Sequence, residues 1–167
     1  MTDQDLMSTF PPMPPQAGLV WTAIVDVGDP VDLGPARGGQ RFMVPISGGR
    51  FYEGLEGEGL SGTVLAGGAD RQFLRADGVK ELEAIYEMKT YDGTFITIEN
   101  RVVVDTMREP DHYAMSTITA KVRDGPFGWL NRRVLVGTLQ TARPDRNAVI
   151  IRAWIMKDVF EGLTQAD

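Results

Sequence analysis

The chain has 167 residues, of which 43% are hydrophobic, and it carries a formal net charge of −6. This length suits one domain with a buried core, and the acidic balance disfavours a nucleic-acid or anionic-membrane partner. The sequence has no cysteine and one histidine, which excludes disulfides, thiolate nucleophiles and a histidine-rich metal centre within one chain.

The N-terminal segment has neither the basic region nor the apolar core of a signal peptide, so we expect a cytoplasmic protein. Residues 1–17 include the run FPPMPP at 10–15. They are predicted to form an extended Pro-rich arm, because proline cannot donate a ladder hydrogen bond. Such an arm could be a docking ligand of the PxxP type. We favour an arm that packs on its own domain or on a dimer mate.

Nine segments with strand character follow, most of them separated by Gly, Pro and Asp. They span residues 19–27, 40–46, 58–66, 70–75, 80–90, 94–104, 111–122, 132–140 and 147–157. No segment shows sustained helical periodicity, although residues 157–163 could form a short helical turn. Strands at this spacing are typical of a sandwich or a barrel. We predict an all-β fold, a single antiparallel β-barrel of about nine strands over residues 18–160, with a tail at 161–167, because closure removes exposed edges.

Two Asp-Gly pairs, Asp77-Gly78 and Asp92-Gly93, lie between segments that alternate apolar and polar residues. This setting indicates hairpin turns, whose two central positions are expected to need positive φ. Residues 80–90 should therefore be one strand shared by two hairpins. The two aspartates then lie roughly 30 Å apart at ~3.3 Å per residue, which is too far for a catalytic pair. Alternation places four side chains of this strand on the interior face: Leu82, Ala84, Tyr86 and Met88.

The last predicted strand is apolar on both faces. Ile150, Trp154 and Met156 share one face, and Ile151 and Ile155 lie on the other. This pattern predicts that the outer face of the strand is also covered, and we expect a second copy of the chain to cover it in a homodimer.

The order of short motifs from residue 46 onward resembles the DUF3237 family, also called UPF0311. The matching stretches are Ile46–Gly49, Leu60–Asp70, Arg75–Gly78, Tyr86, Thr90–Gly93, Asn100, Tyr113 and Trp129–Asn131. The resemblance implies a compact barrel of the lipocalin or calycin type, found in small bacterial proteins and largely without assigned chemistry.

Asp70 is the first candidate for catalysis. It follows Gly67-Gly68, a pair that indicates a bulge or sharp bend. Its carboxylate could act as a general acid or base at a cavity mouth, or it could cap the bend through backbone hydrogen bonds. Arg75 could bind a substrate carboxylate or phenolate, but alternation places it on the face opposite Asp70.

Tyr86 and Tyr113 are expected on interior faces, where each could polarise a carbonyl group or be a core tyrosine with its hydroxyl satisfied. Five further residues are candidates for substrate binding: Gln72, Asn100, His112, Trp129 and Asn131. Structural alternatives exist for three of them, because His112 could be an exposed strand residue, Trp129 could plug one barrel end, and Asn131 could cap a turn.

These residues favour a small barrel enzyme that binds an apolar or aromatic molecule in its lumen and uses acid–base chemistry of the isomerase, cyclase or lyase type. We expect it to need no metal and no organic cofactor. The alternatives are a lipocalin-like carrier or sensor without turnover and, less favoured, a scaffold protein with a filled barrel. A polar lumen with an aspartate and an arginine near a tyrosine favours the enzyme, and a wholly apolar lumen favours the carrier.

Overall fold

The computed structural model describes residues 1–105 and 112–158, which form ten strands, one α-helix and one 3-10 helix. The strands are β1 (Gln16–Val27), β2 (Val31–Ala36), β3 (Gly39–Glu53), β4 (Gly62–Val64), β5 (Ala69–Leu74), β6 (Lys80–Thr90), β7 (Phe95–Asp105), β8 (Tyr113–Val122), β9 (Leu135–Thr141) and β10 (Ala148–Lys157). The helices are α1 (Asp3–Thr9) and η1 (Gly128–Arg132). The predicted strand at 80–90 matches β6 at both ends. Most of the predicted turn at 157–163 lies outside the described residues.

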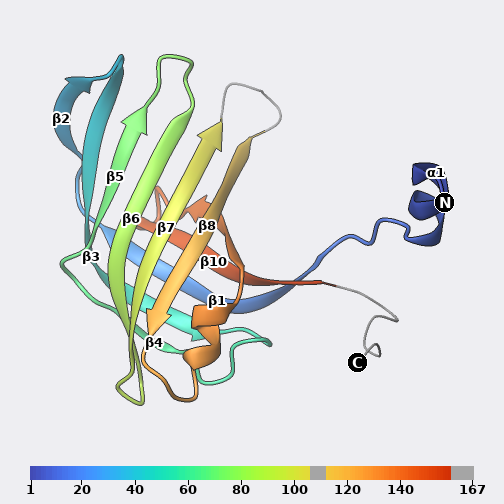
Figure 1. The fold of residues 1–167 in the computed structure, drawn as a ribbon. Coiled ribbons are helices and arrows are strands. Elements are labelled where there is room, and N and C mark those ends of the chain that lie inside the picture. The colour runs from blue at the N-terminus through green and yellow to red at the C-terminus, as the bar shows by residue number, and fades with distance from the viewer. Residues whose placement is uncertain (106–111, 159–167) are drawn as a thin grey trace.

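The strands close into a barrel whose neighbouring strands all run antiparallel (Figure 1). Eight positions form the closed circuit, in the order β1, β3, β5, β6, β7, β8, β9 and β10, and β10 pairs with β1 again. β4 shares one position with β5, since both lie between β3 and β6 along different halves of those strands. The predicted all-β barrel is confirmed.

β2 is a strand that the sequence analysis missed. Its residues include Gly34 and Pro35, which are typical of loops. Within the described residues β2 pairs with β3 alone, and an edge strand of this kind tolerates proline because no ladder bond is lost. The register shift beside Gly34, whose φ is 81°, gives the strand a bulge. The barrel domain therefore has ten strands, where about nine were predicted.

Both Asp-Gly pairs form hairpin turns, but their geometry differs from the prediction. Only the glycines have positive φ, 86° at Gly78 and 93° at Gly93. Each turn is thus the three-residue hairpin loop, in which only the last loop residue is left-handed. The aspartates act through their side chains: Asp77 Oδ1 accepts a hydrogen bond from the N–H of Val79 at 3.1 Å, and Asp92 Oδ1 accepts one from Thr94 at 3.1 Å.

The N-terminal arm is helical at its start, where the sequence analysis predicted an extended segment. Thr2 and Asp5 form a capping box: the Thr2 N–H donates to Asp5 Oδ2 at 2.8 Å, and the Asp5 N–H donates to Thr2 Oγ1 at 3.2 Å. This reciprocal pair satisfies N–H groups that a short helix leaves free. Every residue from 1 to 17 is exposed, and α1 lies away from the barrel (Figure 1). The arm therefore does not pack on its own domain.

Large apolar side chains fill the barrel end at which η1 and the β6–β7 turn lie (Figure 1). Trp21, Phe51 and Leu60 are fully buried in this core, and Leu130 of η1 joins them. Asn131 fixes η1 to the end of β8, because its amide donates to the carbonyl of Val122 at 2.8 Å and accepts from the N–H of the same residue at 3.0 Å. This end of the barrel is closed by packing.

The Gly67-Gly68 pair forms the bend that leads from β4 into β5. Gly67 has a φ of 108°, which favours glycine. Gly68 lies so close to β6 that an added Cβ would stand 2.5 Å from the Cβ of Tyr86 and 2.7 Å from the carbonyl oxygen of Ile85. The second glycine therefore lets β5 approach the strand that carries Tyr86.

We predict that Gly68→Ala destabilises the protein, because the new methyl group meets backbone atoms that cannot move aside. Overpacking of this kind typically costs about 1–3 kcal/mol, which urea unfolding would measure. Gly128→Ala is the matched control, since its Cβ would meet nothing nearer than the Arg123 carbonyl at 3.8 Å. Equal unfolding midpoints for the two variants would contradict the close approach.

Candidate functional site

A cavity of about 360 Å³ occupies the half of the lumen away from η1. Its walls are mostly valine, isoleucine, leucine and alanine side chains from the inner faces of the strands. The polar and charged residues that line it are Asp70, Gln72, Lys80, Tyr86, Asn100, Thr141 and Arg143. Ligand pockets commonly combine apolar walls with a few polar groups at this size, so the lumen is the candidate site.

The register of β5, β6 and β7 determines which polar residues of the cavity lie side by side. Asp70 of β5 pairs with Ala84 of β6, and Ala84 pairs with Asn100 of β7. All three side chains point inward, because inward residues alternate along each strand. Asp70 and Asn100 therefore face each other across the small Ala84 side chain, two strand spacings or about 9.5 Å apart at the backbone.

Asp70 is the carboxylate of the lumen. Its Oδ2 accepts a hydrogen bond from Gln72 Nε2 at 2.9 Å, and its buried Oδ1 has no protein partner among the described residues. Burial raises the pKa of Asp70, while the Gln72 hydrogen bond and the positive charge of Lys80 oppose that rise. A buried carboxyl group with a raised pKa and one free oxygen is a candidate to take up and return a proton.

Tyr86 lies two residues beyond Ala84 on β6, diagonally opposite Asp70. Neighbours on such a diagonal are within reach of an aromatic side chain. Tyr86 is 2% exposed. Burial raises its pKa far above the usual value, and the negative charge of Asp70 raises it further. The phenol therefore keeps its proton and serves as a hydrogen-bond donor.

Asn100 is 1% exposed, and neither its amide nitrogen nor its amide oxygen has a partner among the described residues. An unsatisfied buried polar group typically costs about 1–3 kcal/mol. Because Asn100 lines the cavity, its amide can donate and accept hydrogen bonds there, so it is a candidate for contact with a bound molecule.

Three of the predicted residues lie elsewhere. Arg75 follows β5 and forms ion pairs with Asp77 and with Glu81 at 3.3 Å, on the outer side of the sheet. His112 is exposed just before β8. Tyr113 is 54% exposed and shares the outer phase of β8, so the expected interior position is wrong. Only Tyr113 contradicts its expected face, since Arg75 lies on the face opposite Asp70 as alternation predicted and His112 takes the exposed position considered for it.

Trp129 and Asn131 lie at the closed end, away from the cavity. Trp129 is partly buried against the core, and Asn131 bonds to Val122. These positions fit the structural alternatives considered for both residues.

Two charged cavity residues were not anticipated. Lys80 begins β6 and shares the inward phase of Leu82 and Ala84, so extending the alternation by one step would have found it. Arg143 lies in the β9–β10 connection, where no periodic pattern points to the lumen.

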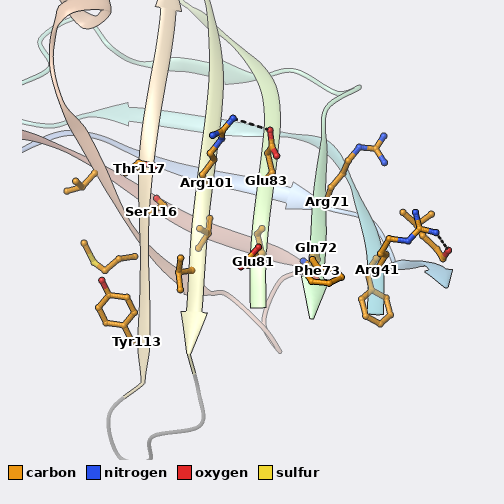
Figure 2. Close-up of a pocket in the computed structure, with 17 residues that line it drawn as sticks. Arg41, Arg71, Gln72, Phe73, Glu81, Glu83, Arg101, Tyr113, Ser116 and Thr117 are labelled. Carbon is orange, nitrogen blue, oxygen red and sulfur yellow. Dashed lines mark hydrogen bonds and ion pairs between the residues drawn. The ribbon is translucent and has the colours of Figure 1, made fainter. Parts of the chain in front are cut away.

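A larger and shallower groove of about 1000 Å³ follows the outer faces of β3 and β5–β8. Figure 2 shows Arg41 toward one end of it and Tyr113 toward the other. Several of its charges are already paired within the protein: Arg101 lies 3.8 Å from Glu83, and Arg41 donates to the carbonyl of Leu33 at 2.8 Å. Its charged side chains are mostly solvated, so the lumen remains the stronger candidate.

Metal ligands do not gather in the described part of the chain, which contains no group of three or more histidine, aspartate or glutamate residues suited to hold an ion. Neither helix there is long and apolar enough to cross a membrane.

A family model described as a protein of unknown function (DUF3237) matches residues 15–156. A UPF0311 protein of Clostridium acetobutylicum is 30% identical over 142 residues, which cover 84% of this chain and 80% of that protein. A UPF0311 protein of Rhodopseudomonas palustris is 41% identical over 81 residues, or 48% of this chain. That alignment spans 50% of the relative, about half of its length.

Solved structures share the barrel. A conserved protein of unknown function from Rhodopseudomonas palustris superposes with a TM-score of 0.76 at 26% identity, covering 87% of this chain and 99% of that one. A beta-barrel-like protein from Acinetobacter baumannii superposes with a TM-score of 0.75 at 26% identity, covering 89% of this chain and 99% of that one. An enzyme from Penicillium herquei superposes with a TM-score of 0.68 at 20% identity, covering 87% of this chain and 97% of that one. At this identity the likeness is one of fold alone.

We predict that Asp70→Asn raises the thermal midpoint at neutral pH. Because the pKa of Asp70 is raised in the folded protein, the folded state holds this proton to higher pH than the unfolded chain does. Stability therefore falls as pH rises from the usual value of 3.8 through the raised pKa, and the loss is complete above it. The variant has no carboxyl group and escapes this loss. The difference in thermal midpoint between the variant and the wild type should therefore decrease toward pH 4, which thermal unfolding followed by circular dichroism would measure.

Asp92→Asn is the control, for which we expect the opposite change in the thermal midpoint. Hydrogen bonds from Thr90 and Thr94 lower the pKa of Asp92, so its carboxylate stabilises the fold above the usual pKa, and this contribution is lost as pH falls through the lowered value. That variant should melt below the wild type at neutral pH. A lower midpoint for Asp70→Asn as well would contradict the assignment of a buried, desolvated charge.

Proposed function

The chain belongs to the DUF3237 family, whose model is described as a protein of unknown function, and from the lumen of its barrel we propose that it binds an apolar or aromatic small molecule there and acts on it by acid–base chemistry. The observation that carries the proposal is the inner row of the cavity, where the half-free carboxyl group of Asp70 faces the unpartnered amide of Asn100. A lumen built only to store an apolar ligand gains nothing from these buried polar groups.

The residues suggest a division of roles. Asp70 takes a proton from a carbon beside a carbonyl group and later returns it to another position of the same molecule. Negative charge develops on the carbonyl oxygen when the proton leaves. The hydroxyl of Tyr86 and the amide nitrogen of Asn100 are the donors placed to stabilise that oxygen. Isomerisation and cyclisation follow this pattern, and elimination differs in that the proton goes to the leaving group. In retro-aldol cleavage Asp70 takes the proton of the β-hydroxyl group and returns it to the enolate carbon left by the broken C–C bond. Each of these reactions can proceed without a metal or an organic cofactor.

The fold is compatible with this role, since the Penicillium herquei protein that shares the barrel is described as an enzyme. Its identity to this chain is too low to transfer a reaction or a substrate.

A carrier without turnover is the second candidate, and the apolar walls of the cavity favour it. Carrier and enzyme differ at Asp70, because a carrier needs a neutral partner for its ligand and no group that exchanges protons. A homodimer formed through the outer face around Trp154, and a cytoplasmic location, remain predictions.

We predict that the wild-type protein speeds the exchange of carbon-bound hydrogen for deuterium beside the carbonyl of aryl ketones and aryl keto acids in D₂O. Asp70→Asn should slow this exchange by roughly 10²–10⁴-fold, and Tyr86→Phe by roughly 10²–10³-fold, with much smaller changes in probe affinity. Proton NMR would follow the exchange, and fluorescence or calorimetry the binding.

Asp77→Asn serves as the matched control, because Asp77 lies in an exposed turn outside the cavity and its loss should leave the rate unchanged. Exchange that is equally fast in Asp70→Asn removes Asp70 from the mechanism. Binding of the probes by the wild type without any exchange would favour the carrier.

A further inference from the structure

The mouth of the cavity carries two cations, one of which, Lys80, also acts through its charge on Asp70 deeper in the lumen. Lys80 and Arg143 both line the cavity, and neither belongs to an ion pair among the described residues. Arg143 uses its Nε to donate to Asn147 Oδ1 at 2.8 Å, which orients the side chain and leaves its terminal nitrogens available. The neighbouring Arg146, in contrast, is paired with Asp26 at 2.7 Å.

The inner end of the same cavity requires a different partner. Asp70 Oδ1 can accept a hydrogen bond, and the Asn100 amide can both donate and accept. Ala84 lies between these residues and adds only a methyl group. A hydroxyl or carbonyl group inserted over Ala84 would satisfy both side chains.

We infer that the lumen binds a small amphiphilic acid, a molecule with an apolar or aromatic body, a hydroxyl or carbonyl group at its inner end and an anionic group at its outer end. The inner oxygen meets Asp70 and Asn100 over Ala84, and the anion meets Lys80 and Arg143. This inference rests on the lumen as the site of the proposed function and specifies its substrate class.

The strand that links the two ends limits the length of the molecule. Lys80 precedes Ala84 by four residues on β6, which corresponds to about 13 Å at ~3.3 Å per residue. A cavity of about 360 Å³ has room for one or two rings with a short chain. A neutral hydrocarbon would leave Asp70 and Asn100 without partners, and a polyphosphate would exceed the charge that two cations balance.

The test compares three probes by isothermal titration calorimetry. These are 3-(4-hydroxyphenyl)propanoate, which has both polar ends, 3-phenylpropanoate, which lacks the hydroxyl group, and 3-(4-hydroxyphenyl)propanamide, which lacks the charge. Each missing group should weaken binding by ~10-fold or more, the effect of losing a hydrogen bond to a charged group.

Substitutions test the outer and the inner end of the cavity separately. Lys80→Gln should reduce the preference for the acid over the amide, because it removes one of the two cations, and should keep the preference for the hydroxyl group. Lys89→Gln is the matched control, because Lys89 lies on the same strand but outside, 5.3 Å from the centre of the Phe95 ring. Ala84→Leu should block the inner end and abolish binding of all three probes, whereas Ile85→Leu on the outer face should not.

Equal affinity for the acid and the amide, an unchanged preference in Lys80→Gln, or no binding of any probe at millimolar concentration would each overturn the inference. The proposed function is judged separately by deuterium exchange. Selective binding of the acid without exchange on any ketone supports the inference and refutes catalysis. Exchange on neutral ketones without any preference for an acid supports catalysis and refutes this substrate class.

Discussion

Closure of an antiparallel sheet is the constraint on which the rest of this structure depends. In a closed barrel, every second residue of every strand must point into a lumen of fixed width. A polar residue in the inward phase can escape to solvent only near the ends of the barrel. Asp70, Tyr86 and Asn100 are in that phase away from the barrel ends, so the fold commits them to the lumen and each must find a partner there or remain unsatisfied.

The polar groups that make the cavity a candidate site also lower the stability of the fold. Burial disfavours the Asp70 carboxylate, and the single hydrogen bond from Gln72 and the charge of Lys80 only partly offset that cost. The close packing at the other end, around Trp21 and Phe51, shows that the same barrel can be filled completely with apolar side chains. One half of the molecule thus provides the stability that the other half gives up, a division common where a site must stay reactive.

Much of the fold could be predicted from the sequence, because hairpin turns and strand alternation are local signals. β6 was located to the residue by the Asp-Gly pairs at its two ends. β2 and α1 were missed for physical reasons: Gly34 and Pro35 hide an edge strand, and α1 depends on a capping box in a segment whose prolines drew attention first. Alternation placed Tyr86 correctly. It also placed Arg75 on the outer face, but it could not place Arg143, because that residue lies in a connection, where side-chain direction depends on the turn and has no period.

The packed end of the barrel has a consequence for the order of events at the site. Because Leu130 and its neighbours seal that end, the lumen is a blind pocket and has no through-channel in the described part of the chain. A bound molecule must therefore leave by the opening through which the next one enters. Under the proposed catalytic function, product and substrate would compete for the free protein, and accumulated product would act as a competitive inhibitor.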